Sequence, residues 1–240
     1  KELSRLSLQF GQNVLAATNK YFLHVTDSAQ LAGLPPFVVD AAASEAKERT
    51  LEGWVFTLQA PSYGPFMQYS DNRTLREKMW RAYNGKSLND EYDNRENIKS
   101  IVTLRRQKAA LLGYPTHAAY VLEENMAKDA ATVNTFLGDL LDKTLPYAKK
   151  EVQEIQEYSA GKGNNDPLMP WDFNYWSEKY KNEKYAFNDE LLKPYFRLEN
   201  VEKAIFSLAD TLFGLQFTPN PSIPVYHPDV KVYEVTEKGG

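Results

Sequence analysis

The stretch LEGWVFTLQAPSYGPFMQYSDNRTLREKMWRAYN (residues 51–84) decides the fold. Its segment Trp54–Gln59 is rich in β-forming residues and too short for a helix, so we predict a strand there. Pro61 suits the first turn of a short helix that follows. Asp71 or Asn72 then caps a second helix, because either side chain accepts a hydrogen bond from a free backbone amide.

Apolar residues recur at helical spacing along most of the chain. Asp93 and Glu96 resemble a capping box that opens one of the longer helices. We predict helices at residues 4–25, 36–52, 93–112, 116–126, 130–160, 171–184, 188–193 and 199–213. The fold class is therefore mainly α, a multi-helix chain with a few short β-strands. The loop SAGKGNNDPLMP (159–170) is the candidate subdomain boundary within an otherwise single, largely helical portion, 1–240.

The C-terminal stretch VYHPDVKVYEVTEKGG (225–240) predicts one more strand, because residues 231–235 would alternate in direction, with Val232 and Glu234 facing opposite ways from Tyr233 and Val235. Charged residues and glycine at 237–240 indicate a hairpin turn, and no return strand follows. A lone strand is not stable in water. We therefore expect this last strand to be unpaired and the chain to be one portion of a longer protein.

Composition bounds the function classes. The 240 residues are 42% hydrophobic and 25% charged, with 15 Tyr, 12 Phe and 4 Trp, which excludes a disordered chain. The formal net charge is −4, and the basic pairs at 105–106 and 149–150 are isolated among acids. Without a basic stripe, we expect no nucleic-acid partner.

No apolar run approaches the roughly 18 residues of a membrane span, so we expect no membrane partner. The chain holds no cysteine, which excludes a disulfide scaffold, a thiol nucleophile and a thiolate zinc site. Cytosol and periplasm both tolerate a cysteine-free chain. We expect a cytoplasmic protein, with the periplasm as the alternative.

The three histidines are the first candidates for chemistry. His24 lies at the end of a predicted helix, where the helix dipole favours a histidine for structural reasons. His117 begins a helix, and Glu124 two turns later would lie on the same face. His227 lies in a loop with no local partner of the metal-binding type. No two histidines are four residues apart, so the sequence holds no His-Glu-x-x-His zinc motif.

Carboxylates and aromatics are the other candidates. Most acids face lysines or arginines on polar helix sides, which is typical of a solvated surface. Asp172 and Glu178 lie in an aromatic setting and are the exceptions to test. We favour burial in the core for this aromatic cluster over the alternative, a lining for a peptide-binding cleft. Its members are Trp171, Phe173, Tyr175, Trp176 and Tyr180.

Four stretches together resemble a known family. They are residues 51–84, LMPWDFNYWSEKY with LLKPYF (168–180 and 191–196), VYHPDVKVYEV (225–235) and ALLGYPTHAAYVLEENMAKD (110–129). The chain is similar to the thimet-oligopeptidase family of zinc metallopeptidases, in its bacterial peptidyl-dipeptidase and oligopeptidase A branch. The resemblance runs through essentially the whole chain in the right order.

The resemblance implies a zincin-type, largely helical ellipsoid split by a deep channel that admits short peptides. In that family a His-Glu-x-x-His helix and a further Glu hold zinc, the metal activates water, and the motif Glu is the general base. None of these residues matches a position in this sequence. We therefore assign no catalytic, cofactor-binding or metal-binding residue here, and expect zinc only in the full-length parent.

The resulting expectation is an inactive portion of a peptide-hydrolysing zinc peptidase that forms part of the channel wall. Two alternatives stay open: a stand-alone helical module that binds peptides without cleaving them, and a pseudo-enzyme with substituted ligands. In the isolated chain an interface is exposed, so we also expect self-association, with the strand at 230–235 as one contact.

Overall fold

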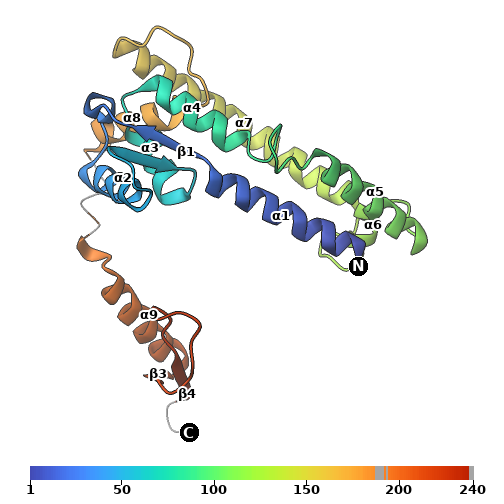
Figure 1. The fold of residues 1–240 in the computed structure, drawn as a ribbon. Coiled ribbons are helices and arrows are strands. Elements are labelled where there is room, and N and C mark those ends of the chain that lie inside the picture. Colours follow the sequence, from blue (N-terminus) through green and yellow to red (C-terminus); the bar gives the residue numbers. More distant parts are fainter. Residues whose placement is uncertain (187–191, 193, 238–240) are drawn as a thin grey trace. The chain divides into compact units, whose positions relative to one another are not determined.

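The computed structural model describes residues 1–186, 192 and 194–237. Over these residues the chain is mainly helical with a few short antiparallel strands, as predicted (Figure 1). It divides into two compact units, Lys1–Lys184 and Tyr185–Gly240. The loop 159–170, predicted as a boundary, lies within the first of these units. No helix in the described part of the chain is long and apolar enough to cross a membrane.

The first unit carries most of the helices. Its elements are α1 (Glu2–Lys20), β1 (Phe22–Val25), the 3₁₀ helix η1 (Ser28–Leu31), α2 (Pro36–Glu48), β2 (Trp54–Thr57), α3 (Ala60–Tyr69), α4 (Arg73–Asn84), α5 (Arg95–Leu111), α6 (His117–Leu122), α7 (Ala130–Gly161) and α8 (Phe173–Tyr185). The second unit contains α9 (Leu198–Phe213), β3 (Leu215–Pro219) and β4 (Tyr233–Glu237). The helix predicted at 188–193 lies outside the described residues apart from Leu192.

The core of the first unit forms around β1 and β2. The two strands pair antiparallel, with His24 opposite Val55, and α2 and α3 pack against β2. Phe56 and Phe66 are completely buried there, with ring centroids 4.7 Å apart. Burying side chains of this size removes the largest apolar areas from water, and each contributes about 1.5–3 kcal/mol. This cluster therefore anchors the elements on which the polar site described below is built.

The predicted helix over residues 4–25 is wrong in its last turn. Helix α1 ends at Lys20, and residues 22–25 form β1. The segment Phe22–Val25 contains aromatic and branched residues, and pairing with β2 stabilises it as a strand. Gly53 makes the approach of the two strands possible, because its φ is +89° and a Cβ there would lie 2.4 Å from the Val25 carbonyl oxygen.

The predicted cap of α4 is confirmed, and the predicted capping box of α5 is wrong. Asn72 is the N-cap of α4, and its side chain accepts a hydrogen bond of 3.1 Å from the Leu75 amide. Helix α5 instead begins after Asn94. Asp93 binds the side chain of Arg95, and its carboxylate also accepts the Arg95 amide at 2.9 Å. Asp93 therefore binds the neighbouring Arg95 and does not form a reciprocal capping box with Glu96.

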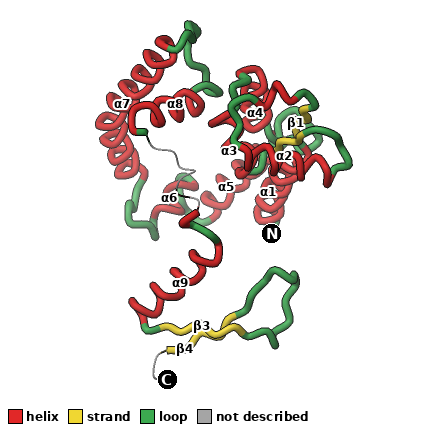
Figure 2. The backbone as a smooth tube through the Cα atoms, turned by 90° about the vertical axis from the view of Figure 1, so that its left-hand side faces the viewer, coloured by secondary structure: helices red, strands yellow, loops and turns green. Residues whose placement is uncertain are grey.

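Helices α1 and α5 lie side by side (Figure 1 and Figure 2). Polar side chains connect them. The Asn94 side chain donates to the Phe10 carbonyl at 3.1 Å and accepts from Asn13 at 2.9 Å. One turn further, the Asn97 side chain donates to the Leu6 carbonyl at 3.1 Å. The buried amide of Asn94 and the half-buried amide of Asn97 reach helix carbonyls and so fix the register of the two helices.

The last strand is paired, which corrects the expectation of an unpaired one. Strand β4 pairs antiparallel with β3, with Val235 opposite Phe217. Phe206 of α9 stacks on Phe217 at 4.5 Å and meets Tyr233 edge-on at 4.9 Å. Strand β3 was missed because it follows the helix directly. The expected turn at 237–240 falls almost entirely outside the described residues.

Candidate functional site

A buried ion cluster joins α4 to the residues just before α8. Asp172 is 0% exposed and Arg76 is 2% exposed. Arg76 donates to the Asp172 carboxylate at 2.9 Å and to the Ser70 carbonyl at 2.7 Å. Arg73 approaches the same carboxylate from the surface at 2.8 Å and also reaches Asp166 at 3.0 Å. The cluster therefore links α4 to the residues just before α8.

The electrostatics of Asp172 favour the ionised form. Burial alone raises the pKa of this carboxyl. Hydrogen bonds from Arg73, the Met169 amide and Arg76 outweigh the burial, so the pKa lies below its usual range. Burial lowers the pKa of Arg76 more than Asp172 raises it. A carboxylate whose lone pairs are all engaged is a poor proton acceptor, so the arrangement suits structure rather than acid–base catalysis.

Glu178, which lies within α8, is also buried. It is 5% exposed and accepts hydrogen bonds from Gln68 at 2.6 Å and from Asn182 at 3.0 Å. Lys181 lies 2.8 Å from the same carboxylate. The two acids singled out from the sequence, Asp172 and Glu178, are therefore exceptions to the solvated surface. Each is engaged by surrounding donors.

The aromatic cluster divides between core and surface. Trp171 and Tyr175 are buried, as the core interpretation predicts. Trp176 and Tyr180 are half-buried and both pack against the ring of Tyr158, with centroids 6.2 and 5.2 Å away. Phe173 is exposed, so the core interpretation does not extend to it.

Two of these aromatics are tied directly to the ion cluster. The Arg76 guanidinium lies 4.0 Å from the centre of the Tyr175 ring, a cation–π contact in a desolvated setting. The Tyr175 hydroxyl donates to Asp71 at 2.7 Å. Trp171 meets Trp80 edge-on at 5.7 Å and supplies its carbonyl to Arg76. Sequence reasoning missed Arg73 and Arg76, whose only signal was two arginines three residues apart on the helix.

The three histidines occupy unrelated settings. His24 lies in β1 rather than at a helix end, and its Nε2 is 2.6 Å from the Glu52 carbonyl oxygen. His227 belongs to the second unit, where its Nδ1 accepts from the Asp229 amide at 3.3 Å. Asp229 also brings a carboxylate within 3.7 Å of that nitrogen, a partner that the sequence interpretation missed.

His117 is the first residue of α6, and the predicted alignment with Glu124 is wrong. The helix ends at Leu122, so Glu124 lies beyond it and the two-turn spacing does not apply. The ring of His117 instead packs against Tyr120, with centroids 6.2 Å apart. Its buried Nδ1 has no hydrogen-bond partner within the described part of the chain.

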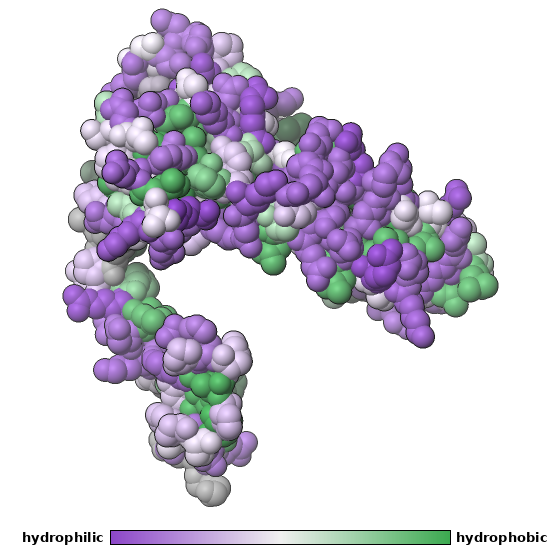
Figure 3. Space-filling model, in the orientation of Figure 1, coloured by the Kyte–Doolittle hydropathy of each residue, from purple (hydrophilic) through white to green (hydrophobic). Residues whose placement is uncertain are grey.

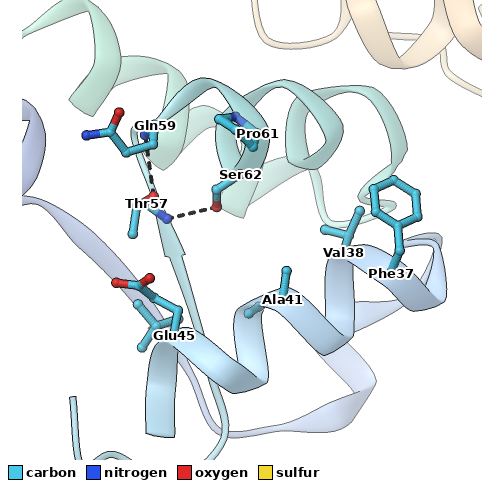
Figure 4. A pocket seen from close by; sticks show the side chains of 10 residues that line it. Phe37, Val38, Ala41, Glu45, Thr57, Gln59, Pro61 and Ser62 are labelled. Carbon is cyan, nitrogen blue, oxygen red and sulfur yellow. Dashed lines mark hydrogen bonds between the residues drawn. The ribbon is translucent and has the colours of Figure 1, made fainter. Parts of the chain in front are cut away.

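A shallow hollow of about 240 Å³ lies between α2 and the start of α3 (Figure 4). Its floor is apolar, and the polar groups at its rim are engaged. Ser62 accepts from the Thr57 amide at 3.0 Å, and the Gln59 side chain donates to Asn19 at 2.6 Å. Glu45 at the far side binds Arg49 at 2.7 Å. The hollow therefore offers an apolar surface without a free reactive group among the side chains drawn.

The zinc ion that the family resemblance implies does not fit the residues that the structure describes. Among residues 1–186, 192 and 194–237, no three His, Asp or Glu side chains gather as a metal site. A catalytic zinc needs three protein ligands around one point. His24 and His117 stand without the neighbours that such a set needs, and no step of catalysis is derived from them.

Comparisons with known proteins identify the family. The sequence profile described as Peptidase family M3 matches residues 66–240. Oligopeptidase A of Escherichia coli (strain K12) is 36% identical over 241 residues, covering 98% of this chain and 35% of that protein. Organellar oligopeptidase A, chloroplastic/mitochondrial, of Arabidopsis thaliana is 38% identical over 254 residues, covering 100% of this chain and 32% of that protein.

A third relative carries a different name. Dipeptidyl carboxypeptidase of Escherichia coli (strain K12) is 34% identical over 242 residues, covering 100% of this chain and 36% of that protein. The chain thus spans about a third of the length of the curated relatives it matches. The match of the profile over most of the chain shows that this protein belongs to Peptidase family M3, the thimet-oligopeptidase family.

Proposed function

We propose that this chain is a non-catalytic portion of a zinc metallopeptidase that hydrolyses short peptides, and that it forms part of the wall of the substrate channel. The observation that carries the proposal is the family match over residues 66–240. The names of the relatives, oligopeptidase A and dipeptidyl carboxypeptidase, support peptides as the substrate class. The two names leave dipeptide release and general oligopeptide cleavage as alternatives.

Inactivity of the isolated chain is part of the same proposal. Among the described residues, the buried carboxylates of Asp172 and Glu178 are engaged by arginine, lysine and amide donors. In the same described part of the chain, no three His, Asp or Glu side chains gather around one point. The parent would supply zinc, its ligands and the general base from sequence outside these 240 residues.

Two rival functions follow from the same fold. A stand-alone helical module would bind peptides without cleaving them, and a pseudo-enzyme would continue into a domain with substituted ligands. Sequencing the parent gene past codon 240 separates the three. We expect an open frame that encodes His-Glu-x-x-His. A stop codon directly after codon 240 would contradict the proposal and favour the binding module, and a frame with substituted ligands would favour the pseudo-enzyme.

Self-association and location complete the proposal. In the described part of the chain, β4 pairs with β3 along one edge only, so its other edge is open to a further strand. We propose that the isolated chain self-associates in part through this edge. We also propose a cytoplasmic location, with the periplasm as the alternative.

A further inference from the structure

Helix α7 carries an apolar stripe that is exposed between residues 136 and 147. The stripe consists of Phe136, Leu137, Leu140, Leu141 and Tyr147. Spacings of three, four and seven residues place them on one side of the helix. Their exposed fractions run from 48% to 71%, although these are among the residue types most often buried. On the face drawn in Figure 3, hydrophobic residues likewise surface in separate patches within polar surroundings.

The stripe continues a face that is already an interface. Ile155, Tyr158 and Ser159 follow Leu137, Leu140 and Leu141 by five turns of about 3.6 residues, so they lie on the same side of α7. Ile155 and Ser159 are buried, and Tyr158 packs against the aromatic rings of α8. One helix face is therefore covered at its C-terminal end and uncovered at its N-terminal end.

The charges on α7 argue against a lipid surface as the cover. The helix contains five acidic residues and three lysines in its sequence AATVNTFLGDLLDKTLPYAKKEVQEIQEYSAG. Helices that lie on membranes carry an excess of Lys and Arg on the polar side, because membrane surfaces are anionic. The opposite side of α7 carries both negative and positive charges, such as Asp142 and Lys149, and is exposed to water.

We propose that the stripe of α7 packs against the part of the parent polypeptide that lies outside these 240 residues. This inference rests on the proposed function, in which the chain belongs to a longer peptidase. The relatives indicate how much polypeptide would be available to cover the stripe. The match with this chain takes in 35% of oligopeptidase A and 36% of dipeptidyl carboxypeptidase. About two thirds of a parent of that size is available, and large exposed apolar patches mark such interfaces.

The absence of cysteine from the chain allows a direct test by thiol labelling. Leu140→Cys reports on the stripe, and Asp142→Cys on the same helix reports on the opposite, exposed side. Each variant is made in the 240-residue chain and in the full-length parent, and maleimide labelling of the α7 peptide is followed by mass spectrometry. We expect Leu140→Cys to label at least about tenfold more slowly in the parent than in the isolated chain, because a covered site reacts only on opening. Asp142→Cys should label equally fast in both.

Three results would overturn the inference. Equal labelling of Leu140→Cys in the parent and the isolated chain would show that nothing outside these 240 residues covers the stripe. Protection in the parent that disappears on dilution would assign the stripe to a second copy. A stop codon directly after codon 240 would overturn the inference together with the proposed function, whereas an open frame with unchanged labelling would overturn the inference alone.

Discussion

Arg76 and Asp172, which are 96 residues apart in sequence, form a buried ion pair with a separation of 2.9 Å. The pair joins α4 to the start of α8, and the Tyr175 ring covers the guanidinium. Removing one member of a buried pair leaves the other charge without compensation. The pair is therefore the position in the first unit where a single substitution should cost most.

The variant Asp172→Asn keeps the shape of the side chain and removes its charge. We expect the free energy of unfolding to fall by about 3–5 kcal/mol, because Arg76 stays buried without its counter-ion. Urea titration followed by circular dichroism measures the change. Glu96→Gln is the matched control, since Glu96 pairs with Lys99 on the surface and its loss should cost less than about 1 kcal/mol. Equal losses in the two variants would contradict this role of the pair.

Acid should destabilise the chain partly through Asp172. The pKa of this carboxyl is lower in the folded chain than its usual value. Its contribution to stability is therefore complete above the unfolded pKa of about 3.9 and is lost as the pH falls through the folded pKa. We expect the difference in unfolding free energy between the unsubstituted chain and Asp172→Asn to shrink as the pH falls below about 4. A difference that stays constant down to pH 2 would show that Asp172 does not titrate in this way.

Substituting alanine for two different glycines should change the stability of the chain in opposite directions. Gly53 has φ +89° and leaves no room for a Cβ beside Val25, so Gly53→Ala should destabilise by about 1–3 kcal/mol. Gly138 lies inside α7, and nothing lies within 4 Å of a Cβ placed there. Gly138→Ala should stabilise by about 0.5–1 kcal/mol, since glycine is costly within a helix. Thermal unfolding of both variants provides the comparison, and shifts of the same sign would contradict the geometry at Gly53.

Self-association of the isolated chain should depend on the open edge of β4. Val235 is exposed in this strand, and charges on edge strands block the addition of further strands. We expect the apparent mass in light scattering to rise with concentration, and Val235→Lys to reduce that rise. A sharp monomer at high concentration would remove the basis for this contact.

Local signals in the sequence predicted much of the fold. The cap predicted at Asp71 or Asn72 and the strand predicted at 54–59 depend on residues that are near neighbours. Asn72 is the cap and a strand forms at 54–57, two residues shorter than predicted. Strand β1 was missed because its stability comes from pairing with β2, about 30 residues later along the chain. The pairing of β3 with β4 depends on a similar contact across a long loop.

The buried polar site was harder to predict than the helices. Asp172 was noted for its aromatic setting, whereas its partners Arg73 and Arg76 lie almost a hundred residues away. Nothing near Asp172 in sequence indicates which cations compensate it. The pairing of Asp172 with Arg73 and Arg76 becomes visible only when the fold brings α4 next to the residues just before α8.

The central proposal, that this chain is a non-catalytic portion of a zinc peptidase, is tested most directly with the isolated chain. The measurement is zinc content by elemental analysis together with cleavage of a quenched fluorescent peptide, with and without EDTA. We predict less than one zinc per chain and no EDTA-sensitive cleavage, while the full-length parent shows both. One zinc per isolated chain together with EDTA-sensitive peptide cleavage would contradict the account.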